Sequence, residues 1–155
     1  DWLARQGIPV PASPNSWATR SGGGLVARLG ISEFLLEDGP AGDAAATFAA
    51  AMTPSRAWPV LRQDAALALR GGALPELLAQ TCGVNFRDLE AARRPVALTM
   101  VAGVAVTLIP SEEGGVAGCR VWCDGSYGIY LWRSLLGIAE ELGGGAAGWS
   151  WWFPG

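Results

Sequence analysis

Apolar residues recur along this chain in short blocks separated by glycine and proline, a pattern typical of short strands and helices. The chain opens with a helix that ends at Gly7, and further helices are predicted for residues 43–52, 73–81 and 127–142. Strands are predicted for residues 25–30, 32–39, part of 58–71, 96–101, 104–109 and 118–123. The sequence therefore predicts a fold that contains both helices and strands.

Two of the predicted elements have a distinct apolar face. In the strand within 58–71, Ala65, Leu67 and Leu69 alternate with other residues and share one side. In the helix 127–142, residues at three- and four-residue steps form one apolar face. These residues are Tyr130, Leu131, Ser134, Leu135, Ile138 and Leu142. Both elements are therefore expected to cover a core.

The order of elements repeats along the chain. Leu3-Ala4 aligns with Leu78-Ala79, and Gly7-Ile8 aligns with Gly83-Val84. A proline-bearing loop, a strand pair and a helix follow in each case. We interpret this as two β-α-β-β-α units, about 1–55 and 56–145, with the opening strand of the first unit absent; residues 146–155 form an aromatic tail. A coincidental match of two short helices is the alternative.

Composition narrows the possible chemistry. The 155 residues include no histidine and no lysine, and all 11 basic residues are arginine. Catalytic triads, histidine-ligated zinc, lysine Schiff bases and the lysine of a P-loop are thereby excluded. The net charge is -3, and Arg93-Arg94 is an isolated basic pair in an expected solvated loop. Nucleic acid is therefore not an expected partner.

The cysteine content and the length of the apolar runs indicate the cellular compartment in which the chain is expected. Cys82, Cys119 and Cys123 do not form a disulfide framework, and the last two are expected to be small buried residues on one strand. The longest apolar run, residues 96–109, is shorter than the roughly 20 residues that span a bilayer. We therefore expect a reducing, cytoplasmic compartment and no membrane partner.

Several polar features are candidate catalytic or binding groups. The carboxylate pairs Glu37-Asp38, Glu112-Glu113 and Glu140-Glu141 stand where solvated charge is expected, and neighbouring side chains point to different faces. Asp64 and Asp124 stand alone on strands, with no partner evident from the sequence. The two glycines in ALRGGALPELL indicate a tight strand-to-helix turn rather than an anion site.

Tryptophan is unusually frequent, at 8 of 155 residues. The last seven residues contain Trp149, Trp151, Trp152 and Phe153 after a glycine-rich joint. Such an aromatic cluster needs a cover, either its own sheet or another subunit, and we identify it as a candidate partner interface. Trp122 alternates with Cys119 and Cys123 and is expected on the opposite face of their strand.

Five segments together resemble the sarcosine oxidase gamma subunit family, which is related to the folate-binding domains of the glycine-cleavage T-protein. They are DWLARQGIPVPASPNSW, GGLVARLGISEFLLEDGP, WPVLRQDAALALRGGALPELLAQTCGVNF, RRPVALTMVAGVAVTLIP and CRVWCDGSYGIYLWRSLLGIAEELGG. The most specific pieces are LAQTCGVNF and RVWCD with YGIYLW. The resemblance extends over nearly the whole chain, to about Gly145.

The resemblance implies an α+β fold of the T-protein type over residues 1–145. It also implies a non-catalytic small subunit of a multi-subunit flavoenzyme that oxidatively demethylates sarcosine or a related N-methyl amine. FAD, FMN, NAD, zinc and tetrahydrofolate then belong to partner subunits, and no catalytic, cofactor or metal residue is assigned to this chain. The alternative is a stand-alone T-protein-like module that binds folate or another small ligand between the two units. A third hypothesis, an independent enzyme, would have to use a residue such as Asp64 or Cys82.

Overall fold

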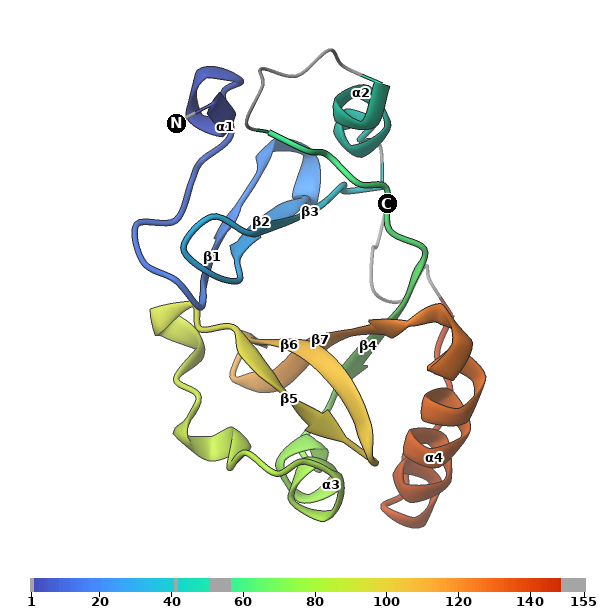
Figure 1. Ribbon diagram of the computed structural model, residues 1–155. Coiled ribbons are helices and arrows are strands. Elements are labelled where there is room, and N and C mark those ends of the chain that lie inside the picture. Colours follow the sequence, from blue (N-terminus) through green and yellow to red (C-terminus); the bar gives the residue numbers. More distant parts are fainter. Residues whose placement is uncertain (1, 41, 51–56, 149–155) are drawn as a thin grey trace. The chain divides into compact units, whose positions relative to one another are not determined.

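The computed structural model describes residues 2–40, 42–50 and 57–148, which form an α+β structure with two antiparallel sheets (Figure 1). The chain divides into two compact units, residues 1–62 and 63–155. Within the described ranges, no helix is both long enough and apolar enough to cross a membrane.

Unit 1 contains a three-stranded antiparallel sheet in the order β1-β2-β3. Its elements are α1 (Trp2–Arg5), β1 (Ser16–Thr19), the 3-10 turn η1 (Ser21–Gly23), β2 (Leu25–Arg28), β3 (Phe34–Glu37) and α2 (Ala44–Ala50). Leu25, Val26 and Ala27 are all buried because β2 is the central strand. The ring of Trp2 in α1 meets that of Phe48 in α2 edge to face, with centroids 5.6 Å apart. This contact joins the two helices of the unit.

The glycine-rich segment 21–24 packs closely against the end of β3. A side chain at Gly39 would overlap the carbonyl oxygen of Gly22, and one at Gly24 would lie 2.5 Å from the carbonyl oxygen of Glu37. These glycines are therefore required for the approach of two backbone segments.

Unit 2 contains a four-stranded antiparallel sheet in the order β4-β7-β6-β5. Its strands are β4 (Asp64–Arg70), β5 (Ala97–Val101), β6 (Val104–Glu113) and β7 (Val116–Asp124). Its α-helices are α3 (Leu74–Thr81) and α4 (Gly128–Glu141), and its 3-10 turns are η2 (Phe86–Asp88), η3 (Ala91–Arg93) and η4 (Gly125–Tyr127). Ala102 and Gly103 join β5 to β6 with positive φ angles, as a two-residue hairpin turn requires.

One hydrophobic core joins both helices of unit 2 to one face of its sheet. Leu77 and Leu78 of α3 and Leu131 and Leu135 of α4 meet residues of all four strands there. Ala65, Leu67 and Leu69 of β4 pack against this core, as predicted from their alternation. The prediction for α4 is partly wrong: Tyr130 is exposed and lies outside the core, at the flank of the helix that faces the β5–β6 turn.

The order of elements repeats between the two units, but not as the predicted β-α-β-β-α unit. Each unit has a helix, three consecutive antiparallel strands and a second helix, in the order α1-β1-β2-β3-α2 and α3-β5-β6-β7-α4. The repeated unit thus has three strands in succession where the sequence indicated two. Strand β4, which precedes α3 and pairs with β7, has no counterpart among the described residues of unit 1.

Candidate functional site

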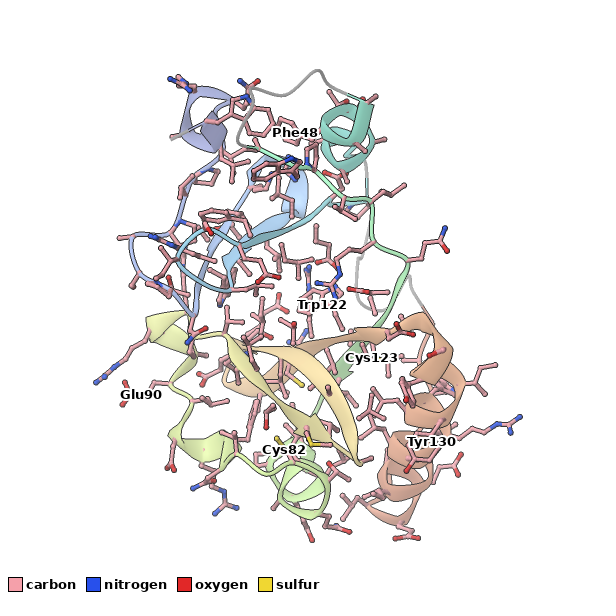
Figure 2. The ribbon with its side chains drawn as sticks, in the orientation of Figure 1. Phe48, Cys82, Glu90, Trp122, Cys123 and Tyr130 are labelled. Carbon is pink, nitrogen blue, oxygen red and sulfur yellow. The ribbon has the colours of Figure 1, made fainter. Side chains whose placement is uncertain are left out.

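Four large apolar side chains are exposed at the N-terminal end of α4. Tyr127, Ile129, Tyr130 and Trp132 are respectively 53, 71, 55 and 42% exposed, and we call these four residues the aromatic end of α4. The Tyr130 hydroxyl donates a hydrogen bond to the carbonyl oxygen of Ala102, at 3.1 Å (Figure 2). That bond ties the ring to the β5–β6 turn, so part of this surface is held in place while its apolar atoms face solvent.

The predicted interface residues Trp149, Trp151, Trp152 and Phe153 lie outside the described residues. The described chain reaches them through a reversal at the end of α4. The Gly143 N–H donates to the carbonyl of Glu140 at 3.0 Å, and the Gly144 N–H donates to that of Ala139 at 2.7 Å. Gly143 has a φ of 80°, as expected for a glycine that ends a helix.

Asp64 and Asp124, which showed no partner in the sequence, lie directly opposite one another in the β4–β7 pairing. Asp124 accepts hydrogen bonds from the backbone N–H of Ser126 at 2.9 Å and from the Ser126 hydroxyl at 2.5 Å. These carboxylates also affect the neighbouring thiol of Cys123. Burial raises the pKa of this thiol, and the charges of Asp64 and Asp124 raise it further. This thiol is therefore held protonated rather than activated as a nucleophile.

The cysteines behave as the sequence indicated. All three are free thiols, and Cys119 and Cys123 are buried in the core on one face of β7. Burial also raises the pKa of Cys119, with a smaller contribution from Cys82. Trp122 is buried and does not belong to that helix-side core, in agreement with its predicted opposite facing (Figure 2). Cys82 follows α3 and forms an isolated β-bridge with Val101 of the edge strand β5.

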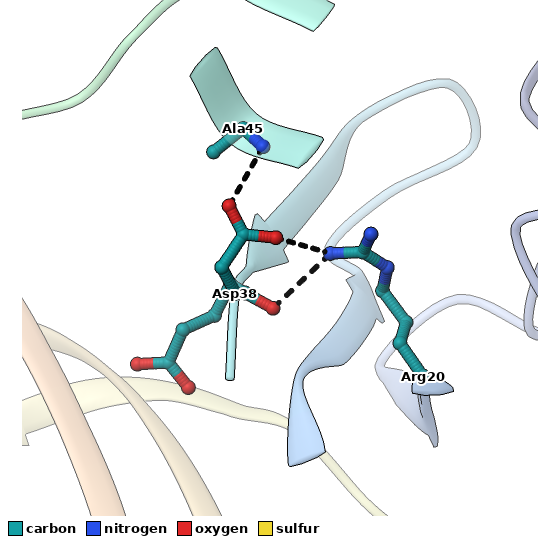
Figure 3. A network of polar contacts seen from close by, with 4 residues as sticks. Arg20, Asp38 and Ala45 are labelled. Carbon is teal, nitrogen blue, oxygen red and sulfur yellow. Dashed lines mark hydrogen bonds and ion pairs between the residues drawn. The ribbon is translucent and has the colours of Figure 1, made fainter. Parts of the chain in front are cut away.

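The pair Glu37-Asp38 is not simply solvated charge, and this expectation was wrong for Asp38. Its carboxylate accepts a hydrogen bond from Arg20 Nη1 at 2.9 Å and another from the Ala45 N–H at 2.8 Å (Figure 3). The side chains of Arg20 and Asp38 are only 11 and 18% exposed. Burial alone would raise the pKa of Asp38, but the bond from Ala45 and the Arg20 guanidinium outweigh it and lower the pKa.

The remaining candidate residues take part in ion pairs or in a tight turn. The exposed Glu113 pairs with the half-buried Arg70 at 2.7 Å, and the exposed Arg93 pairs with Glu90 at 2.6 Å. The segment between β4 and α3 is a tight turn, in which the Leu74 N–H donates to the Gly71 carbonyl at 3.1 Å. Within the described ranges, no cluster of three or more histidine, cysteine or acidic side chains is arranged to hold a metal ion.

Searches against protein-family models, curated proteins and solved structures found no match to this chain.

Proposed function

We propose that this chain is the non-catalytic small subunit of a sarcosine oxidase-like flavoenzyme, in which larger partner subunits oxidatively demethylate sarcosine or a related N-methyl amine. The partners then bind FAD, FMN, NAD and tetrahydrofolate. The resemblance of the five sequence segments supports this assignment. The shared order of helix, three strands and helix in both units is compatible with a duplicated, T-protein-like fold.

The observation that most favours a subunit role is the aromatic end of α4. Exposed apolar side chains are unfavourable in water, and buried aromatic residues often dominate the affinity of protein interfaces. Ile129 is the most exposed of the four residues, and the opposite face of the same helix packs into the core. We therefore assign this surface to the partner interface, with the aromatic tail 149–153 as its second part.

The test is co-expression of the chain with the proteins encoded by the neighbouring genes. We expect an amine-oxidising flavoprotein to co-purify with the chain in fixed stoichiometry. Flavin absorbance and sarcosine oxidation should belong to the complex and to the large subunits. Flavin or sarcosine oxidase activity on the isolated chain would refute the proposal, as would a set of flavoproteins that never associates with it.

A pair of variants in α4 tests the assigned surface. Ile129→Ser removes an exposed apolar side chain without touching the core, so the chain should fold and bind its partner about tenfold more weakly. Glu141→Ser, at the other end of the same helix, is the matched control and should bind as the unaltered chain does. Equal affinities of the two variants, measured by titration calorimetry, would remove α4 from the interface.

A further inference from the structure

Strand β4 stands at one edge of the sheet of unit 2, next to β7, in the order β4-β7-β6-β5. The Gly71 N–H donates to the Ala117 carbonyl at 3.0 Å, directly beyond the last residue pair of β4 and β7, and this bond fixes the alternation of hydrogen bonds along the ladder. The odd-numbered residues of β4 therefore direct their N–H and C=O groups toward β7. The even-numbered residues direct theirs away from the sheet, and they are Asp64, Ala66, Ala68 and Arg70.

The outward edge of β4 has the features of an edge that accepts another strand. Ala66 and Ala68 are exposed, and among the residues that the structure describes no backbone hydrogen bond reaches their outward groups. Proteins commonly block exposed strand edges with proline, inward-pointing charge or bulges. Strand β4 contains no proline, its pairing with β7 has no bulge, and its two charged residues stand at its ends. The edge is therefore suited to strand pairing.

The sequence of β4 is complementary to itself. When two copies of the strand pair in antiparallel fashion, outward-facing residues must stand opposite outward-facing residues to exchange hydrogen bonds. A two-fold axis through Leu67 meets this condition, because it places Ala66 opposite Ala68 of the second copy. The same axis places Asp64 opposite Arg70 and pairs all seven residues of each strand. Moving the axis to Ala66 or Ala68 shortens the pairing and places the charged residues opposite alanine.

The charges at the two ends of β4 favour the same arrangement. Asp64 and Arg70 lie on one face of the sheet, since alternate positions of a strand share a face. Asp64 already lies opposite Asp124 of β7, an arrangement that like charges disfavour. Arg70 of the second copy would stand on the other side of Asp64, where opposite charges on facing residues stabilise a strand pair. Arg70 can keep its ion pair with Glu113, because a guanidinium has five N–H donors.

We propose that this chain forms a two-fold dimer through β4, in which the unit 2 sheets of the two copies join into one continuous sheet. Each copy supplies the strand that the other accepts, so a single interface satisfies both edges. The inference goes beyond the proposed function and does not depend on it, because β4 is a different surface from the aromatic end of α4. The presence or absence of the dimer therefore leaves the subunit assignment as it stands.

Sedimentation velocity of the purified chain, from about 1 µM to about 1 mM, tests for this dimer, and we expect a reversible monomer–dimer equilibrium. Ala68→Pro removes an outward N–H and leaves the hydrogen bonds between β4 and β7 in place, whereas the matched control Ala68→Thr keeps that N–H. Because the two-fold axis repeats the lost bond, Ala68→Pro should dimerise at least about tenfold more weakly than Ala68→Thr. Amide exchange of the β6–β7 ladder verifies that both variants are folded.

An exchange of charges tests the register. Asp64→Arg places two arginines opposite each other at both ends of the strand pair, and Arg70→Asp places two aspartates there. Each variant alone should therefore dimerise about tenfold more weakly than the unaltered chain. In an equimolar mixture of the two variants, each end of the strand pair again joins an arginine to an aspartate. The mixture should recover a heterodimer with close to the affinity of the unaltered dimer.

Each result decides the proposal. A chain that stays monomeric over the whole range overturns it, and so does a dimer that Ala68→Pro and Ala68→Thr affect equally, because another surface then joins the copies. A mixture that dimerises as weakly as the single charge variants overturns the pairing centred on Leu67. The outward amides of Ala66 and Ala68 should exchange more slowly as the protein concentration rises. Protection at every concentration would mean that a segment of the same chain covers the edge, which also overturns the dimer.

Discussion

The ion pair between Arg20 and Asp38 should stabilise unit 1 substantially. Asp38 links the end of β3 both to Arg20, just beyond β1, and to the backbone of α2 (Figure 3). Asp38→Asn keeps the shape of the side chain but removes its charge. Hydrogen bonds to charged groups contribute about 1.5–3 kcal/mol each, and partial exposure reduces that figure. We therefore expect unit 1 to lose about 2 kcal/mol of stability.

The measurement is amide hydrogen exchange in the central strand β2, which reports the opening of unit 1 by itself. A loss of about 2 kcal/mol should accelerate exchange of the Val26 and Ala27 amides about thirtyfold at neutral pH. Asp43→Asn is the control, since Asp43 is an exposed acid close to the same helix. It should change the rates little.

The pH dependence of this effect tests its electrostatic origin. The pKa of Asp38 is lowered in the folded state, so its contribution is present above the unfolded pKa of about 4 and is lost as the pH falls through the folded pKa. The difference between Asp38→Asn and the unaltered chain should therefore shrink in acid. A difference that stays unchanged however far the pH falls below the unfolded pKa of about 4, or an unchanged exchange rate at neutral pH, would refute the reasoning.

Three other predictions follow from local geometry. Arg28 donates to four backbone carbonyls of two loops, so Arg28→Lys should accelerate exchange in unit 1 by roughly tenfold, and an unchanged rate would contradict this role. Gly39→Ala should prevent unit 1 from folding, because its methyl group would overlap a backbone carbonyl. The matched variant Gly137→Ala faces open space in α4, so it should raise the stability of unit 2 by up to about 1 kcal/mol, as measured by urea titration. Cys119 and Cys123 should resist a thiol reagent at pH 8 in the native chain, because their pKa values are raised, and react only on unfolding.

The periodic elements of this fold could be predicted from the sequence, and β1 could not. Alternating residues and glycine or proline boundaries predicted both β4 and α3. The helix predicted for residues 73–81 is α3, Leu74–Thr81, and the strand predicted within residues 58–71 is β4, Asp64–Arg70, at the C-terminal end of that range. Ser16–Thr19 has neither a long alternation nor strong strand residues throughout, and it follows three prolines. It is a strand because the buried β2 has backbone groups on both sides to satisfy, a tertiary requirement that local propensity does not register.

The polar contacts were the least predictable part. Arg20 and Asp38 are separated by 18 positions, and only the register of β1, β2 and β3 brings them together. Asp64 and Asp124 face one another for the same reason, through the pairing of β4 with β7. A register is set by long-range pairing, so carboxylates that look isolated along the chain acquire partners only in the folded sheet.

The two units differ in the size of their sheets, and this difference should appear in their stability. Each strand of unit 1 has four residues, whereas β6 and β7 of unit 2 have ten and nine. A shorter three-stranded sheet has fewer ladder hydrogen bonds, so unit 1 should open at a lower free energy than unit 2.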